Sequence, residues 1–454
     1  MVAMRTFFAI WLLAIIGSAG AEEIQVSPFV ADITPPIGAP LCFNLIKPAA
    51  EIEEPLTARG VVILGSGEPI VLCVADFVVI ANASHDAWRE ALATAAGTTP
   101  DRVSMHVIHN HDSPGCDLGA TIELEKQGLV DVMNLRAAHD KAIADTAAAV
   151  AEAVKTKTPV THLGLGTGRV EKFASNRRII GADGKLEMAR MSASRNAEAN
   201  AKPEGTIDPN LNLVTFWNGE TAVVAMTFYA SHPQSYYGRG GVTPDTVGLA
   251  RNLRTKETGA LHLHFDGAGG NVAAGKYNDG SPEARAALVE RIHAGMEAAW
   301  NEQKKVAVKE SDLEWTVAPT QLPWSGRYTE EQLVAELTDP ETTVGNRIRA
   351  ARDVVYYRRW QEGGRIDINC LRIGDARVLF FPGELFVEYQ LAAKAMRPGE
   401  FVAVAAYGDG GPGYIGTEIS YDQGGYEVGR VSRTSPAVEE VLIKVTRQLL
   451  GVTE

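Results

Sequence analysis

Three histidines stand close together in the stretch HVIHNHDSPG, which runs from His106 to Gly115 of a chain with only ten histidines. Two of them, His109 and His111, follow an apolar run and precede a Ser-Pro-Gly turn. Residues i and i+2 of a strand point to the same face, so a His-x-His pair at a strand end can direct both imidazoles into one site. Imidazole is a common metal ligand and a common general acid or base. The pair therefore indicates a metal or catalytic site.

Polar side chains also follow three other apolar runs. His232 follows TAVVAMTFYAS, Glu384 follows VLFFPG, and Asp409 and Tyr414 lie in the glycine-rich segment after FVAVAA. Enzymes of the α/β class usually build their sites where the strands of a sheet end. Two imidazoles and one carboxylate form a common catalytic zinc set that leaves a position open for water or substrate, and a tyrosine can complete it. These side chains are the candidates for a metal centre.

The elements that must position these side chains alternate between strand-like apolar runs and helix-like amphipathic segments. This alternation predicts an α/β protein, with a mixed β-sheet core flanked by helices in a single elaborated domain. The expected helices cover residues 83 to 96, 121 to 156, 245 to 257, 282 to 304, 329 to 337, 343 to 361, 386 to 396 and 435 to 450. Residues 172 to 210 are polar and are interpreted as a long excursion from the core, and residues 310 to 365 as a helical insertion. The sequence contains no internal repeat that we can detect.

The N-terminus has the features of an export signal. Arg5 precedes the apolar run TFFAIWLLAII, and Ala19-Gly20-Ala21 fits a small-x-small cleavage site. Residues 1 to 21 are therefore predicted to be a signal peptide, and the mature chain, 22 to 454, is expected to be secreted or periplasmic without a transmembrane span. A membrane anchor is the alternative, although the run is shorter than the roughly 20 residues that a span needs. The net charge of −13 argues against a nucleic-acid partner.

Two further patterns point less clearly to a site. His262 and His264 form a second His-x-His, in LHLHFDG, where alternation with leucine indicates a strand whose histidines are hydrogen-bonded or partly solvated. The spacing of the four cysteines matches no zinc or redox motif. A bridge between Cys42 and Cys116 is compatible with export, but the sequence does not determine it.

The order of several motifs along the chain resembles the catalytic N-terminal domain of the neutral/alkaline non-lysosomal ceramidase family. The matching segments are ADITPPIG at 31 to 38, HNHDSPG at 109 to 115, SNRR at 175 to 178, HPQS at 232 to 235, PGE at 382 to 384, YIGTE at 414 to 418 and YE at 426 to 427. The resemblance covers most of the mature chain. It implies that residues 22 to 454 form a neutral ceramidase-like zinc hydrolase domain.

The resemblance also implies roles for individual residues. It makes His109, His232, Glu384 and Tyr414 the ligands of one zinc ion. His111 and an arginine, either Arg177 or its neighbour Arg178, would then act on the substrate carbonyl and the tetrahedral intermediate. The family has a serine beside the zinc in a Gly-Asp-x-Ser-Pro-Asn loop, whereas the corresponding segment here is GNVAAG, with Ala273 in place of the serine and Asn271 in place of the aspartate.

These inferences together predict a zinc-dependent hydrolase that cleaves an amide (N-acyl) or ester bond through a metal-activated water. Such an enzyme needs no side-chain nucleophile. Its substrate would be a small or lipid-like molecule, and the loss of the family serine suggests that it is ceramidase-like without being a true ceramidase. Two alternatives remain open. One is an exported metal-binding or ligand-binding protein without catalysis, and the other is a metallophosphoesterase, which the HNHD and HLH segments suggest.

Overall fold

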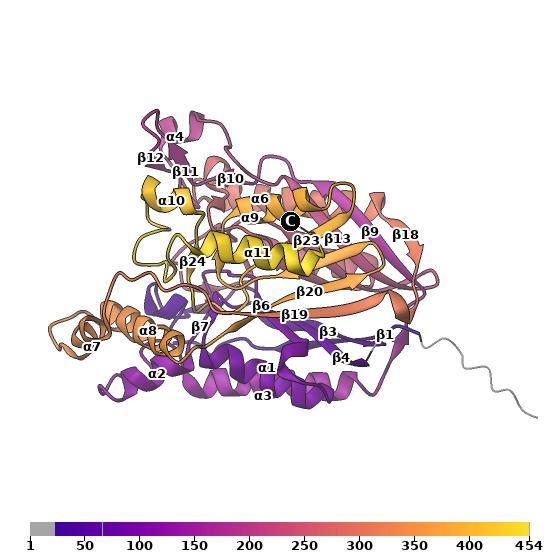
Figure 1. The fold of residues 1–454 in the computed structure, drawn as a ribbon, viewed down its shortest axis with the longest axis horizontal. Helices are drawn as coiled ribbons and strands as arrows, with labels where there is room; N and C mark the ends of the chain where they lie inside the picture. The colour runs from indigo at the N-terminus through magenta and orange to yellow at the C-terminus, as the bar shows by residue number, and fades with distance from the viewer. Residues whose placement is uncertain (1–22, 66, 454) are drawn as a thin grey trace, which may run out of the picture.

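The strands form three mixed sheets that share one topology (Figure 1). In each sheet, an entry strand lies antiparallel to the first strand of a hairpin. The second strand of that hairpin pairs in parallel with a strand that arrives through a helix. A parallel neighbour requires such a crossover, because a tight turn joins only antiparallel strands. The α/β class and the mixed sheets predicted from the sequence are confirmed.

The computed structural model describes residues 23 to 65 and 67 to 453, so the predicted signal peptide lies outside the described residues. The first sheet and its helices comprise β1 (Gln25–Asp32), β3 (Thr57–Gly65), β4 (Gly67–Ala75), α1 (Ala83–Ala96), β6 (Val103–Val107), α3 (Arg136–Ala153) and β8 (Thr158–Pro159). The second comprises β9 (His162–Arg169), β13 (Asn210–Asn218), β14 (Thr221–Tyr229), α5 (Asp245–Thr258), β16 (Leu261–Asp266), α6 (Pro282–Glu302) and β18 (Lys304–Ala307). The third comprises β19 (Leu313–Thr320), β20 (Ile366–Ile373), β21 (Ala376–Phe380), α9 (Val387–Met396), β23 (Phe401–Ala405) and α11 (Val438–Leu450).

The remaining α-helices and strands connect the elements of the three sheets, and many of them lie on the left of Figure 1. They are β2 (Glu51–Ile52), β5 (Val79–Ile80), β7 (Gly115–Cys116), α2 (Leu118–Glu125), β10 (Ser175–Asn176), β11 (Arg178–Ile180), β12 (Leu186–Ala189), α4 (Ala197–Ala201), β15 (Gly241–Val242), β17 (Val272–Ala273), α7 (Glu330–Thr338), α8 (Val344–Gln361), β22 (Glu384–Leu385), β24 (Tyr414–Ile415) and α10 (Glu418–Gln423).

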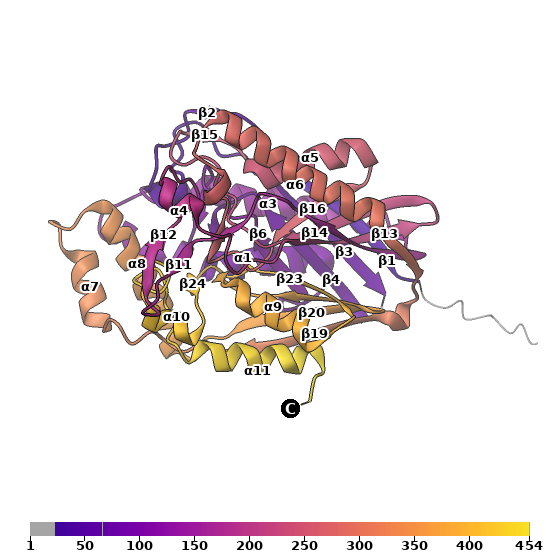
Figure 2. The ribbon, with the colours of Figure 1, turned by 90° about the horizontal axis from the view of Figure 1, so that it is seen from above.

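The inner faces of the three sheets share one core. Leu72 of the first sheet, Phe228 of the second and Phe380 of the third belong to the same cluster of buried apolar side chains. The outer faces are covered by helices, α1 and α3 on the first sheet, α5 and α6 on the second, and α9 and α11 on the third (Figure 2). The central strands are therefore buried on both sides, which explains continuous apolar runs such as IVLCVA in β4.

The structure differs from the sequence-based prediction in several elements. The expected helix 121 to 156 is two helices, α2 and α3, because Gly128 and Asp131 adopt left-handed backbone conformations between them. The stretch 310 to 365 is not wholly helical, since it begins with strand β19. Strand β9 was not predicted because glycine alternates along it. A side chain at Gly166 would collide with a backbone oxygen of α6, so these glycines allow the helix to pack closely on the sheet.

A buried ion pair joins the first sheet to the second layer of helices. Asp76, directly after β4, accepts hydrogen bonds of 2.6 and 3.0 Å from the guanidinium of Arg251 on α5, and both side chains are fully buried. Burial alone would raise the pKa of Asp76, but the charge and hydrogen bonds of Arg251 outweigh it and hold the pKa below 3.8. Asp76 therefore stabilises the fold above that pH, and its contribution is lost as the pH falls through its lower folded-state pKa.

Replacement of Arg251 by Met should lower the free energy of unfolding by about 3–5 kcal/mol, because it leaves the buried Asp76 carboxylate without its partner. Urea unfolding followed by circular dichroism at pH 7 measures the change. Lys256→Met, which removes an exposed basic side chain from the same helix, is the matched control and should leave the midpoint nearly unchanged. Equal effects of the two substitutions would contradict this assignment.

Candidate metal centre

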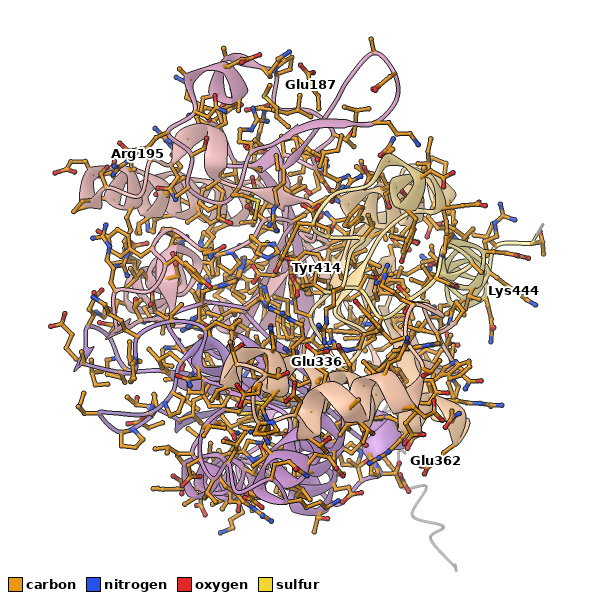
Figure 3. All side chains as sticks on the ribbon, turned by 90° about the vertical axis from the view of Figure 1, so that its left-hand side faces the viewer. Glu187, Arg195, Glu336, Glu362, Tyr414 and Lys444 are labelled. Atoms are coloured by element: carbon orange, nitrogen blue, oxygen red, sulfur yellow. The ribbon has the colours of Figure 1, made fainter. Side chains whose placement is uncertain are left out.

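The ends of strands from all three sheets meet at one end of the molecule. In each sheet, the loop after the hairpin pairs in parallel with the loop after the crossover strand. These pairs are β5 with β7, β22 with β24, and a single bridge between His232 and Ala273. Because of these pairings, the loops that follow the strands of all three sheets lie close together. Figure 3 views the molecule from this end, with Tyr414 near the middle of the view.

Four predicted ligands converge there. The Nε2 atoms of His109 and His232 are 3.2 Å apart, and Oε2 of Glu384 lies 3.4 Å from the first and 3.2 Å from the second. The hydroxyl of Tyr414 lies 3.2 Å from Nε2 of His232. Two ligands at about 2.0 Å from a tetrahedral zinc ion stand about 3.3 Å apart. These four distances, of 3.2 to 3.4 Å, match the edge length of such a tetrahedron.

Hydrogen bonds on the far side of each imidazole orient the ring. Nδ1 of His109 donates to the carbonyl of Val78 at 2.6 Å, and Nδ1 of His232 donates to the carbonyl of Gly269 at 2.8 Å. A carbonyl only accepts, so Nδ1 carries the proton and the Nε2 lone pair faces inward. Burial lowers the pKa of His232 to about 4, which keeps this imidazole neutral.

The inward-facing atoms fit a divalent cation. The contacts between the imidazoles and Glu384 would be ion pairs only if an Nε2 were protonated, and the low pKa of His232 argues against this. Oε2 of Glu384 is buried and has no hydrogen-bond donor among the described residues. Lone pairs that face one another in a buried space repel unless a cation lies between them. The donor set, two imidazoles with a carboxylate and a phenol, is one that zinc accepts.

The convergence of His109 and His111 has a different cause from the one expected. Strand β6 ends at Val107, and His109 adopts a left-handed conformation with φ of 56°. The two rings are therefore brought together by a turn, with centroids 4.9 Å apart and planes at 85°, and not by strand periodicity. The ring of His109 stacks on Tyr407, which is also left-handed, with φ of 63°. Strained residues of this kind are common at functional sites.

His111 completes a group of three histidines that could hold a metal ion. Its ligand atom lies within 4.8 Å of those of His109 and His232. Burial and the neighbouring imidazoles lower the pKa of His111 well below 6.5, and its buried Nε2 has no hydrogen-bond partner within the described part of the chain. Its Nδ1 lies 3.8 Å from the thiol of Cys42.

Arg177, and not Arg178, contacts the ligand cluster. The polar excursion at 172 to 210 places Arg177 beside Tyr414, and its Nη1 donates to the phenol oxygen at 3.0 Å. Arg178 instead points to the backbone of Gly424 and to Glu427. Burial raises the pKa of Tyr414 well above 10, although the charge of Arg177 acts in the opposite direction. The same positive charge would favour the tyrosinate form of a metal ligand.

Two residues near the site had no predicted role. Tyr407 supports His109 and places its hydroxyl 3.3 Å from Nδ1 of His232. Glu427 is buried between the two arginines, with oxygens 3.5 Å from Arg177 and 3.2 Å from Arg178. The only sequence signal for Tyr407 is its place directly after an apolar strand, and Glu427 was visible only as part of the Tyr-Glu motif.

The segment GNVAAG, residues 270 to 275, has a structural role. Ala273 is fully buried in β17 and pairs with Ser175 and with the backbone of His232. The side-chain oxygen of Asn271 accepts from the backbone of Val387, and its amide donates to Glu388. Neither side chain is a nucleophile, so this segment supplies no covalent chemistry.

The remaining sequence candidates lie in other roles. Asp409 accepts hydrogen bonds from the backbone of Asn82 and Gly411, which tie two loops together. His264 is buried, with ring nitrogens 3.1 Å from Asp266 and 2.9 Å from Thr227. All four cysteines, Cys42 and Cys116 among them, are buried free thiols.

The ligand cluster borders two cavities. One, of about 120 Å³, is lined by His109, His111, Glu384 and Tyr414 together with several arginines. The other, of about 400 Å³, is lined by His111, Arg177 and Tyr414 and by residues of the polar excursion. His111 and Tyr414 line both cavities, so a molecule bound in either cavity can contact the ligand cluster.

Comparison with known proteins finds a shared fold. No protein-family model and no curated protein sequence matches the chain. A crystal structure of neutral ceramidase from Pseudomonas aeruginosa superposes with a TM-score of 0.67 at 15% identity, covering 96% of this chain and 76% of the other. A structure described as ceramidase complexed with C2 gives a TM-score of 0.67 at 16% identity, with 94% and 74% covered. Among residues 23 to 453, apart from residue 66, no helix is long and apolar enough to cross a membrane.

The ligand geometry predicts one tightly bound divalent metal ion per chain. The double variant His109→Ala/His232→Ala should lose it, because only Glu384 and Tyr414 would remain of the four converging donors. Mass spectrometry of the purified proteins measures the metal content. Tyr407→Phe, which keeps the ring stacked on His109, serves as the control and should retain the ion. Metal in the double variant at the parent level would contradict this ligand set.

Proposed function

We propose that the protein is a zinc-dependent hydrolase that cleaves an amide (N-acyl) or ester bond and is related to the neutral ceramidases. The observation that carries the proposal is the convergence of His109 Nε2, His232 Nε2 and Glu384 Oε2 within 3.2 to 3.4 Å of one another. Tyr414 is the fourth ligand. A zinc ion in such a site lowers the pKa of water toward 7 and polarises a carbonyl oxygen.

The surrounding side chains have distinct tasks in this proposal. His111 is neutral, because burial keeps its pKa low, and its free ring nitrogen accepts a proton from the attacking water and returns it to the leaving group. Arg177 holds Tyr414 and places a fixed positive charge where negative charge develops on the carbonyl oxygen. Glu427 keeps the guanidinium of Arg177 in place. The carbonyls of Val78 and Gly269 hold the imidazoles in one tautomer, and the ring of Tyr407 stacks on His109.

The substrate in this proposal is a small or lipid-like N-acyl compound. The similar solved structures are ceramidases, and the acyl bond class is carried over from them as part of the proposal. Ala273 leaves the bond to be attacked by water alone, without a covalent intermediate at that position. The predicted signal peptide places the enzyme outside the cytoplasm.

A second candidate is an exported protein that binds the metal without catalysis. Ala273, in place of the family serine, is the observation that favours it. A zinc-loaded protein that hydrolyses no member of a panel of amides, esters and lactones would decide for this candidate.

Replacement of His111 by Ala should leave the metal content at the parent level and lower kcat by about 10² to 10⁴, the range expected for loss of a general base. Metal analysis and hydrolysis of N-acyl substrates are measured on the same preparation. His293→Ala removes a histidine that pairs with Glu257 on the surface, and it should behave like the parent. Loss of the metal from His111→Ala would make His111 a ligand and would overturn its assigned role.

A further inference from the structure

The smaller cavity beside the ligand cluster is lined by arginines. Its lining includes Arg349, Arg352, Arg430 and Arg433, and we call this space the arginine cavity. Glu384 is the only carboxylate among its described lining residues. Four guanidinium groups therefore border one small space in a protein of net charge −13. Their hydrogen bonds and ion pairs differ.

Two of the four arginines are neutralised. Arg430 forms a bidentate pair with Glu336 on α7, at 2.8 and 2.6 Å. Arg433 donates to Asp353 at 2.7 Å and to the carbonyl of Gly411. Figure 3 shows Glu336 on the helix that crosses below Tyr414 at this end of the molecule. These ion pairs balance the positive charges of Arg430 and Arg433.

The other two arginines, on α8, have no anionic partner within 4 Å in the part of the chain that the structure describes. Arg349 donates only to the neutral side chain of Asn346, at 2.9 Å. Arg352 lies with its guanidinium carbon 3.7 Å from the centre of the Phe43 ring, and its buried Nε has no hydrogen-bond acceptor among the described residues. Burial and the charge of Arg433 lower the pKa of Arg352 to about 10, although the charges of Asp117, Asp353 and Glu384 act in the opposite direction.

The local structure holds these cations in position. Arg349 and Arg352 are three residues apart on α8 and therefore share a face, where like charges repel and do not stabilise the helix. Phe43, under Arg352, lies in a run of three left-handed residues, Cys42 to Asn44, whose strain the surrounding structure must support. Phe43 packs in a buried apolar cluster that supports the turn, and its ring holds Arg352 beside the cavity. An anion bound here would offset the repulsion between Arg349 and Arg352.

We propose that Arg349 and Arg352 bind a carboxylate or phosphate of the substrate, so that the enzyme acts on anionic N-acyl compounds such as N-acyl amino acids. Guanidinium groups bind both anions through paired, charge-assisted hydrogen bonds. The arginine cavity, at about 120 Å³, accepts a small headgroup beside the bond that is cleaved. The adjoining cavity of about 400 Å³, lined by Met191, Tyr236 and Tyr237, accepts the apolar acyl part. The proposed substrate class rests on the proposed hydrolase function, whereas anion binding by the two arginines does not.

Three substrates that differ only in the headgroup test the inference on the zinc-loaded protein. N-Octanoylglycine carries a carboxylate, N-octanoylphosphoethanolamine carries a phosphate, and N-octanoylethanolamine is neutral and similar in size to the first. We expect kcat/KM for at least one anionic amide to exceed that for the neutral amide by tenfold or more. The better of the two anionic substrates identifies the headgroup.

Substitution of the arginines localises the effect. Arg349→Gln and Arg352→Gln should each lower kcat/KM for the anionic amide by about 10- to 100-fold, mainly through KM, and change the neutral amide by less than threefold. Arg358→Gln is the matched control, since Arg358 lies on the same helix but pairs with Glu330 and Glu123. Circular dichroism spectra identical to that of the parent exclude misfolding.

A binding measurement separates the two proposals. Titration calorimetry of N-octanoylglycine into zinc-loaded His111→Ala should give a Kd at least tenfold lower than that of N-octanoylethanolamine, and this preference should disappear on adding Arg352→Gln. Selective binding without hydrolysis by the parent would refute the hydrolase and support the anion site. Hydrolysis of neutral and anionic amides at equal rates, unaffected by either substitution, would refute the anion site and leave the hydrolase standing.

Discussion

The structure depends on one constraint: two imidazole nitrogens and a carboxylate oxygen are buried next to one another. Nε2 of His109 and of His232 and Oε2 of Glu384 face one another within 3.4 Å. The protonated Nδ1 atoms of the two imidazoles donate to carbonyls outside the cluster. Such an arrangement is costly without a cation and stable with one, because desolvated lone pairs repel. The fold must therefore hold these atoms rigidly, and the backbone around them shows how it does so.

Rigidity comes from repeating one topology three times. Each sheet ends in a pair of loops held together by a short parallel bridge, and the ligands stand on these loops: His109 after β6, His232 after β14, Glu384 on β22 and Tyr414 on β24. No ligand is carried by a flexible terminus or a long loop. The chain shows no sequence repeat because the shared feature is the order and pairing of the strands, whereas each loop has acquired different residues for its own place in the cluster.

The sequence indicated the candidate ligands more readily than their surroundings. His232 and Glu384 were conspicuous because polar residues interrupt long apolar runs only where a strand ends, and most helices were placed to within a few residues. The supporting contacts depend on partners far away in the chain, such as Arg177 with Tyr414, 237 residues apart, and sequence patterns do not encode them. The sequence likewise does not show that Arg352 lacks an ion-pair partner among the described residues, because this depends on where the carboxylates lie in the folded chain.

In the proposed enzyme, the metal chemistry and the substrate specificity lie on different parts of the fold. The ligands stand on loops that the three-sheet topology itself creates, and a structure at 15% identity retains that topology. The arginine cavity is instead lined by α8 and by the strained turn at 42 to 44, which belong to connections between the repeated elements. Connections of this kind can change without disturbing the strands that hold the ligands. A change of substrate charge with the same metal chemistry therefore requires only new residues on these connections, and Arg349 and Arg352 are residues of that kind.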